Sequence, residues 1–235
     1  MQRRSEIGVE ALLEMVTSGA LQPGEPLPPE SELAQAWGMS RLSVREALQE
    51  LARSGVVTVR HGKRGLLNPV ASWSPLEPRI LQARGTMSGD PLEIPRQMIE
   101  ARRAIEVETT RLAATRPDSP DVDDVKRHLS TMEQTIDSDQ AAFSQADLQF
   151  HAALVRAAGN VYLASAYAPL EEVLHAVRIK TSSQEEIRRR ALQHHTAIYK
   201  AVAAGDVQAA GEAMLSHMDQ TMDDVINSLG AEAFR

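Results

Sequence analysis

The sequence of 235 residues lacks cysteine altogether. This absence excludes disulfide bonds and Cys-based zinc fingers, and nothing in it points to an oxidising compartment. A signal peptide or transmembrane span at the N-terminus is not expected either, because Glu6, Glu10 and Glu14 interrupt MQRRSEIGVEALLEMV. Internal repeats and low-complexity tracts are also missing. We therefore expect a globular protein of the cytoplasm that has no membrane partner.

The formal net charge of the chain is −7, but this charge is unevenly distributed. Residues 1–70 carry eight Lys and Arg against eight Glu, so the whole acidic excess lies in residues 71–235. Within residues 39–65, six basic residues stand against two acidic ones, a local net charge of +4. A polyanion would meet this local patch rather than the total charge, because ions screen electrostatic fields over roughly 10 Å.

The first 69 residues are predicted to form three short helices and a β-hairpin. The first helix ends before LQPGEPLPP, a segment with four prolines, and the second ends at Gly38. The third is expected to begin at Ser43, where Ser43-x-x-Glu46 has the form of a capping box. The VVTVR run, the HGKRG turn and the short LLN run predict a hairpin. This order is typical of a winged helix-turn-helix.

Arg41 and Arg45 lie four residues apart near the start of the third predicted helix, away from its apolar face. In a helix-turn-helix, the corresponding residues enter the major groove, where a guanidinium can bind O6 and N7 of guanine. Each arginine alone could equally pair with a glutamate on a solvated face. Together with Lys63 and Arg64 on the adjacent hairpin, they favour DNA binding. Arg53, at the far end of the helix, suits a capping or phosphate contact better.

The rest of the chain is predicted to be helical. Proline-rich residues 70–94 are expected to form a linker with one short helix. From Pro95 onward one amphipathic segment follows another without strand signals, which predicts an antiparallel bundle of six to seven helices over residues 95–230. The fold class is therefore mainly α: a winged helix-turn-helix over residues 1–69, followed by an all-α bundle.

Three histidines and one aspartate of the predicted bundle are spaced so that they can meet. Asp147 and His151 lie four residues apart on one helical stripe and face the interior together. His195 and His217 lie at similar distances from the turn at residues 205–206, so an antiparallel pair of helices brings them level. Any one of these histidines could be an ordinary core residue. Three nitrogens and one oxygen together form a plausible set of ligands for a divalent metal.

The N-terminal sequence resembles the DNA-binding domain of the GntR superfamily of bacterial transcription regulators. The resemblance lies in PG-x-x-LP-x-E-x-E-LA at residues 23–34, SR-x-x-VREAL at 40–48 and L-x-x-x-G-V at 51–56. It implies contacts with operator DNA from the third helix and, in the minor groove, from the wing. Members often carry an arginine where this chain has Ser31. The residues predicted to contact DNA are Ser31, Arg41, Ser43, Arg45, Arg53, His61, Gly62 and Lys63.

The bundle resembles the FCD ligand-binding domain of FadR-like GntR regulators, which carries a D-x-x-x-H helix followed by two further histidines. The matching residues here are Asp147, His151, His195 and His217. The residue before the second histidine is commonly Glu and is His194 in this chain, at a position expected to face solvent. The resemblance implies a divalent metal, with Zn²⁺ placed before Ni²⁺ and Mn²⁺.

The same resemblance implies an effector, a small carboxylate or sugar acid bound beside the metal. Its acid group is expected to pair with an inward arginine of EARRAIEVETTRLAA, for which Arg102 matches better than Arg103. An extra helix within residues 74–84 is similar to the seven-helix, FadR-type subgroup.

The predicted function is that of a metabolite-responsive transcription repressor and not an enzyme. A homodimer would place two recognition helices on a palindromic operator. An alternative from another class is a metal-dependent enzyme that uses the His/Asp cluster, although no glutamate adjoins His151 or His217 as a general base. A third interpretation is a bundle that serves only to dimerise the DNA-binding domain.

Overall fold

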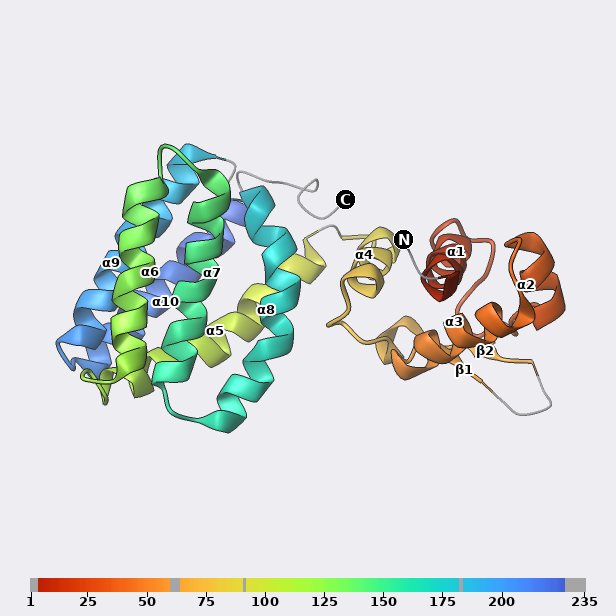
Figure 1. Ribbon diagram of the computed structural model, residues 1–235, viewed down its shortest axis with the longest axis horizontal. Helices are drawn as coiled ribbons and strands as arrows, with labels where there is room; N and C mark the ends of the chain where they lie inside the picture. Colours follow the sequence, from red (N-terminus) through yellow and green to blue (C-terminus); the bar gives the residue numbers. More distant parts are fainter. Residues whose placement is uncertain (1–3, 60–63, 91, 182–183, 227–235) are drawn as a thin grey trace. The chain divides into compact units, whose positions relative to one another are not determined.

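The computed structural model describes residues 4–59, 64–90, 92–181 and 184–226 (Figure 1). The chain divides into two compact units, Met1–Asp90 and Pro91–Arg235. Each unit has a hydrophobic core of its own. Among the described helices, none combines the length and the apolar character that crossing a membrane requires.

The smaller unit is a winged helix-turn-helix, as the sequence predicts. Its elements are α1 (Arg4–Thr17), α2 (Glu30–Ala36), α3 (Arg41–Arg53), β1 (Val57–Thr58) and β2 (Leu66–Leu67). The two strands are antiparallel, with Val57 opposite Leu67 and Thr58 opposite Leu66. On the other edge of β2, Leu66 forms a bridge with Pro26. The proline-rich segment before α2 therefore widens the small sheet that supports the wing.

The predicted start of the third helix is wrong by a few residues. The residue that caps α3 is Ser40, whose hydroxyl accepts the backbone N–H of Ser43 at 3.1 Å. The Ser43 side chain is buried, with its own hydroxyl 3.0 Å from that of Ser40. Both serines suit an N-cap, and the earlier one adds a further turn to the helix. As a result, Arg41 is the first residue of α3.

The segment predicted to be a linker folds as part of the smaller unit. It contains a short 3-10 helix at Val70–Ser72 and α4 (Pro78–Met87). Trp73 is 1% exposed and packs into the same core as α1, α2 and α3, as does Ile80 of α4. A Cβ atom at Gly55, where φ is +73°, would collide with the carbonyl oxygen of Ser72, so only glycine allows this close approach.

Polar contacts bind the start of this segment to the end of α3. The backbone N–H of Ser74 donates to the carbonyl of Ser54 at 2.8 Å, and the Ser54 hydroxyl donates to Glu77 at 2.6 Å. Arg79 donates to Glu50 of α3 at 2.8 Å and to Glu77 at 3.2 Å. Together with the buried Trp73, these contacts make the approach to α4 a continuation of the helix-turn-helix.

The larger unit is an all-α bundle, as predicted. Its helices are α5 (Glu93–Ala114), α6 (Pro120–Thr135), α7 (Gln140–Ala157), α8 (Val161–Thr181), α9 (Glu185–Ala203) and α10 (Val207–Asp224). Figure 1 shows α5 crossing the unit obliquely behind α7. It packs against α7, α8, α9 and α10, while α6 covers α7 and α9. The helix α5 is therefore central, and its inward side chains reach several neighbours.

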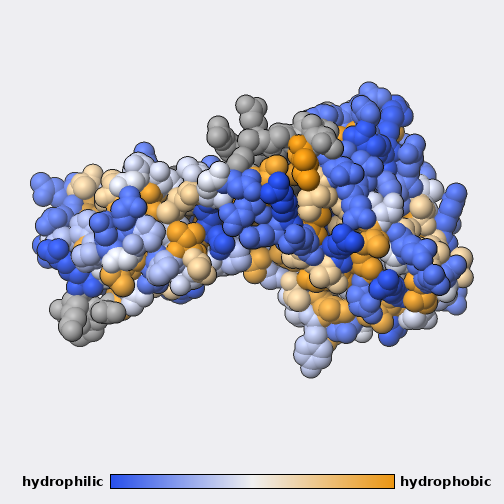
Figure 2. Space-filling view, turned by 180° about the vertical axis from the view of Figure 1, so that it is seen from behind, coloured by the Kyte–Doolittle hydropathy of each residue, from blue (hydrophilic) through white to orange (hydrophobic). Residues whose placement is uncertain are grey.

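The turn between α9 and α10 sets the relative height of those two helices. Gly205, at φ +70°, ends α9, and the Asp206 side chain caps α10 by accepting the N–H of Ala209 at 2.9 Å. The two helices pack along each other from this turn. Between them and α7 lies the main core, to which Phe143, Phe150, Ile198 and Met214 contribute. On the face seen in Figure 2, hydrophilic side chains cover much of this unit, with hydrophobic ones interspersed.

Candidate metal centre and DNA-contacting residues

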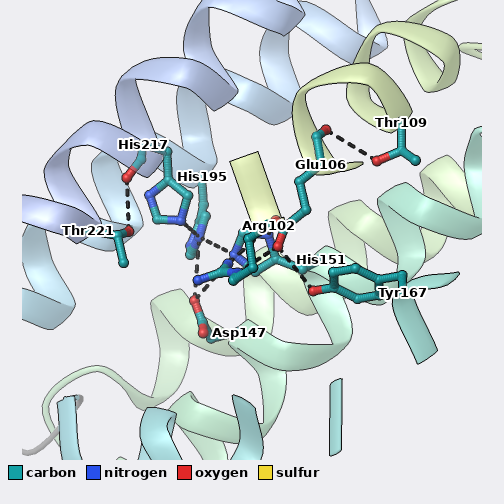
Figure 3. Close-up of polar contacts among 9 residues, drawn as sticks. All are labelled: Arg102, Glu106, Thr109, Asp147, His151, Tyr167, His195, His217 and Thr221. Carbon is teal, nitrogen blue, oxygen red and sulfur yellow. Dashed lines mark hydrogen bonds and ion pairs between the residues drawn. The ribbon is translucent and has the colours of Figure 1, made fainter. Parts of the chain in front are cut away.

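Three histidines from three helices meet inside the larger unit (Figure 3). Nε2 of His195 on α9 lies 3.2 Å from Nε2 of His151 on α7 and 3.2 Å from Nε2 of His217 on α10. Their exposed fractions are 1% or less for His151 and His195 and 2% for His217. One ligand atom from each of the three lies within 4.8 Å of the other two. The spacing around the turn at residues 205–206 therefore brings His195 and His217 level, as predicted.

Asp147 completes the group one turn before His151. Its Oδ1 lies 3.4 Å from Nε2 of His195 and 3.9 Å from Nε2 of His151. The residue is 2% exposed. The three histidines thus form one buried group, and Asp147 lies beside it, nearest to His195.

The distances between these atoms fit a shared divalent cation. A tetrahedral ion with ligands about 2.0–2.1 Å away holds them roughly 3.3 Å from one another. The separations of 3.2, 3.2 and 3.4 Å are close to this value, whereas Oδ1 of Asp147 is 3.9 Å from Nε2 of His151 and lies outside the group formed by the three histidines. Neutral imidazole nitrogens and a carboxylate oxygen suit Zn²⁺ and also Ni²⁺ or Mn²⁺. Donor set and geometry are both compatible with such a metal.

A buried glutamate on α5, Glu106, lies directly behind this group. Its Oε2 is 2.6 Å from Nδ1 of His151, on the side of the ring opposite Nε2. Its Oε1 accepts from Nε of Arg102 at 2.6 Å and from the hydroxyl of Tyr167 on α8 at 3.2 Å (Figure 3). Only 1% of Glu106 is exposed.

The charge of Glu106 is maintained by its neighbours. Burial by itself opposes ionisation of this carboxyl, but the Arg102 guanidinium and the His151 ring more than offset burial and hold the pKa of Glu106 well below its usual range. In the same way, burial disfavours the charged form of Arg102, and the Glu106 carboxylate nevertheless raises the pKa of Arg102. The two residues therefore form a fully ionised buried pair.

Glu106 was not among the predicted site residues, although the sequence carries a signal for it. A buried arginine is rarely left without a carboxylate. Glu106 lies four residues after Arg102, which is the spacing for one helical face.

The structure separates the two arginines proposed for an effector. Arg102 is 2% exposed and donates to Glu106 through Nε and Nη2, at 2.6 and 3.4 Å. Arg103 instead pairs with Asp219 at 3.0 Å on the surface, where about half of each side chain is exposed. His194, expected to face solvent, is half-buried, with its ring centroid 5.7 Å from that of His217.

Arg41 and Arg45 both project from the exposed side of α3. Nη2 of Arg45 lies 2.7 Å from Oε2 of Glu30 on α2, and Nε lies 3.3 Å from Oε1. The hydrogen bond and the charge of Glu30 raise the pKa of Arg45, yet 58% of the side chain remains exposed. This pair links the two helices of the helix-turn-helix on their exposed side.

The other predicted DNA contacts differ in accessibility. Ser31 and Arg53 are exposed, at the start of α2 and the end of α3. Ser43 is 8% exposed and held against Ser40, so its hydroxyl supports the helix end rather than facing outward. His61, Gly62 and Lys63 lie outside the described residues.

Both units match known protein families. Residues 7–65 match the model described as "Bacterial regulatory proteins, gntR family", and residues 97–220 match the FCD domain. The regulator LutR of Bacillus subtilis (strain 168) is 30% identical over 219 residues, covering 89% of this chain and 95% of LutR. The galactonate operon transcriptional repressor of Escherichia coli (strain K12) is 28% identical, covering 88% and 90%.

A solved structure supports the same fold for the whole chain. The Lar protein, described as controlling expression of the Listeria monocytogenes agr system, aligns with a TM-score of 0.66. The alignment covers 97% of this chain and 99% of Lar at 20% identity. At that identity the likeness concerns the fold alone.

Proposed function

Because the chain belongs to the gntR family of bacterial regulatory proteins and carries an FCD domain, we propose that it is a repressor whose DNA binding responds to a small acid bound beside a divalent metal. Regulation of transcription and DNA binding follow from the family. The enzyme alternative is wrong, since the matching domains and the relatives are regulators. The metal, the acid and the homodimer are the proposed parts.

The observation that carries the proposal is the convergence of Asp147, His151, His195 and His217. The three histidine nitrogens lie within 4.8 Å of one another, and Asp147 Oδ1 lies 3.4 Å from His195 and 3.9 Å from His151, an arrangement that supports a shared cation. A bound cation would add positive charge to this point, and an oxygen of an acid would join it by expanding the coordination beyond the four protein ligands. The bundle would then be a sensor and not merely a dimerisation module.

Arg102 supplies a second positive charge on α5. Glu106 accepts from two of its nitrogens, and a guanidinium has five N–H groups, so Arg102 can also donate to a second carboxylate. A relative named for a galactonate operon favours a sugar acid as the class of effector. The smaller unit would contact DNA through Arg41 and Arg45, and a homodimer would place two α3 helices on the half-sites of a palindrome.

The acid can change DNA binding only by as much as its affinity differs between the DNA-bound and released arrangements. We therefore propose that the acid favours an arrangement of the dimer in which the two α3 helices no longer match the half-sites.

Metal analysis and a ligand screen test the proposal together. Purified protein should contain stoichiometric metal, and His151→Ala combined with His195→Ala should lose it. In a thermal-shift screen of small acids, a genuine effector should raise Tm by mass action only when the metal is present. The same acid should lower affinity for operator DNA in a fluorescence anisotropy titration. Wild-type protein without metal, or a double variant that keeps it, would defeat the proposed site.

A further inference from the structure

Glu106 connects three helices of the larger unit through one carboxylate. It lies on α5, contacts His151 on α7 through Oε2 and accepts from Tyr167 on α8 through Oε1. Arg102, on its own helix, balances its charge. The distances are 2.6 Å to His151, 2.6 Å to Arg102 and 3.2 Å to Tyr167. These contacts use both carboxylate oxygens.

The contact with His151 determines which ring nitrogen can bind a metal. An ionised carboxylate only accepts hydrogen bonds, so at 2.6 Å Nδ1 of His151 must carry the proton. In a neutral ring, Nε2 then presents its lone pair, and Nε2 is the atom that faces His195 at 3.2 Å. Glu106 thereby selects the tautomer and orients the ring toward the metal point.

The contact with Tyr167 extends this arrangement to α8. The Tyr167 side chain is 3% exposed and packs with Leu148 and Val155 of α7. Its hydroxyl, buried with the ring, donates to Glu106. A continuous chain of hydrogen bonds thus runs from α8 through Tyr167 and Glu106 to a metal-facing histidine (Figure 3).

We propose that Glu106 is a positioning residue that holds His151 for the metal and, through Tyr167, makes the order of α8 depend on metal occupancy. This inference rests on the proposed metal site. A cation on Nε2 polarises the imidazole, which strengthens the Nδ1–H donor toward Glu106. Because Glu106 is held in this way, it offers Tyr167 a fixed acceptor. When the metal leaves, both contacts weaken and α8 opens more often.

Metal affinity measured by competition with a chromophoric chelator tests the first half. Glu106→Gln should weaken binding by roughly 10- to 100-fold, as expected when the carboxylate behind a ligating histidine is lost. Tyr167→Phe should weaken it by no more than a few-fold. Thr110→Val is the matched control: Thr110 is buried one turn further along α5, and its hydroxyl has no hydrogen-bond partner among the described residues. This control should bind metal like wild type.

Hydrogen exchange of the α8 backbone tests the second half. Adding Zn²⁺ to metal-free wild type should slow exchange of amides in residues 161–173 several-fold, and in Tyr167→Phe this response should disappear. An undiminished response in Tyr167→Phe overturns the link to α8. Wild-type metal affinity in Glu106→Gln overturns the positioning role.

Two further measurements keep the proposal testable, one for the case that Glu106→Gln does not fold and one that reads the His151 tautomer directly. If Glu106→Gln does not fold because Arg102 loses its partner, the double variant Arg102→Met/Glu106→Gln removes both charges and should still bind metal at least tenfold more weakly. Nitrogen NMR of the metal-free protein should show a single His151 tautomer in wild type, protonated on Nδ1. In Glu106→Gln it should show a mixture of both tautomers. Wild type that binds no metal would sink both the proposed function and the α8 link, whereas metal binding with unaltered affinity in Glu106→Gln sinks only this inference.

Discussion

Two Arg–Glu pairs of nearly equal length occupy opposite environments in this protein. Arg45 and Glu30 approach to 2.7 Å on the outer side of the helix-turn-helix, with side chains 58% and 33% exposed. Arg102 and Glu106 approach to 2.6 Å inside the bundle, with side chains 2% and 1% exposed. The N–O distance therefore does not distinguish the two pairs, whereas their exposure to solvent does.

The contrast shows which of the two arginines can exchange its glutamate for another partner. Water and salt screen an exposed pair, so Arg45 can leave Glu30 for a phosphate or base at little loss. A buried pair has no such alternative, because removal of one partner leaves an uncompensated charge in a medium of low dielectric. The outer pair thus suits transient DNA contact, and the inner pair suits a fixed framework for the proposed metal site.

Breaking the buried pair should have the largest effect. Glu106→Ala leaves the Arg102 charge unpaired and should lower the unfolding free energy of the larger unit by about 3–5 kcal/mol. Urea denaturation with a chelator present measures this without any contribution from metal. Arg102→Met/Glu106→Leu removes both charges and should recover most of the loss. A single variant as stable as wild type would mean that the Arg102 charge finds compensation elsewhere.

Removing the proposed metal should lower the thermal stability of the larger unit and leave that of the smaller unit unchanged. If free metal stands about a thousandfold above its Kd, binding stabilises the larger unit by about 4 kcal/mol, a Tm difference on the order of 10 °C. Scanning calorimetry with and without a chelator should show this shift only in the transition of the larger unit. Identical Tm values under both conditions would argue against a metal bound by the four ligands.

Removing the exposed Arg45 should weaken DNA binding and leave the stability of both units unchanged. Arg45→Ala should weaken specific operator binding roughly ten- to a hundredfold, because a bidentate base contact is lost, while both units and the metal remain intact. Arg127→Ala, which removes an equal charge from a surface pair with Asp124 in the other unit, is the control. The assignment of α3 as the recognition helix fails if operator anisotropy titrations give the same Kd for Arg45→Ala and wild type.

The smallest expected effect comes from the acidic partner of Arg45. Glu30→Gln should leave the unfolding midpoint unchanged within error, because the pair is exposed. It should tighten DNA binding a few-fold, since the DNA would no longer compete with Glu30 for the Arg45 guanidinium. Glu32→Gln removes the same charge from an exposed position of the same helix. Equal gains from both variants would indicate an effect of net charge alone.

The order of the elements and the meeting of the histidines could be predicted because they depend on local signals. Glycine and proline mark the ends of α1 and α2, and Gly205 with Asp206 fixes one turn from which His195 and His217 can be counted. A helix has a constant rise, so counting residues from a well-marked turn is enough to place side chains at the same height.

Other features depend on contacts between distant residues and were missed. The prolines of residues 70–94 resemble those of a linker, but burial of Trp73 against the core of α1–α3 assigns residues 70–90 to the smaller unit. The choice between Ser40 and Ser43 as cap is nearly even in local terms. The spacing of four residues from Arg102 is a signal for Glu106, but its contacts with His151 on α7 and Tyr167 on α8 join residues far apart in the sequence.

The attachment of residues 72–79 to α3 has a practical consequence for dissecting the protein. A DNA-binding fragment that ends at residue 69 would lack Trp73 and would expose the apolar surface that this side chain covers. It would also lose the contacts that Glu77 and Arg79 make with Ser54 and Glu50. A fragment that continues through Met87 keeps both. The DNA-binding domain is therefore about twenty residues longer than the helix-turn-helix and wing alone.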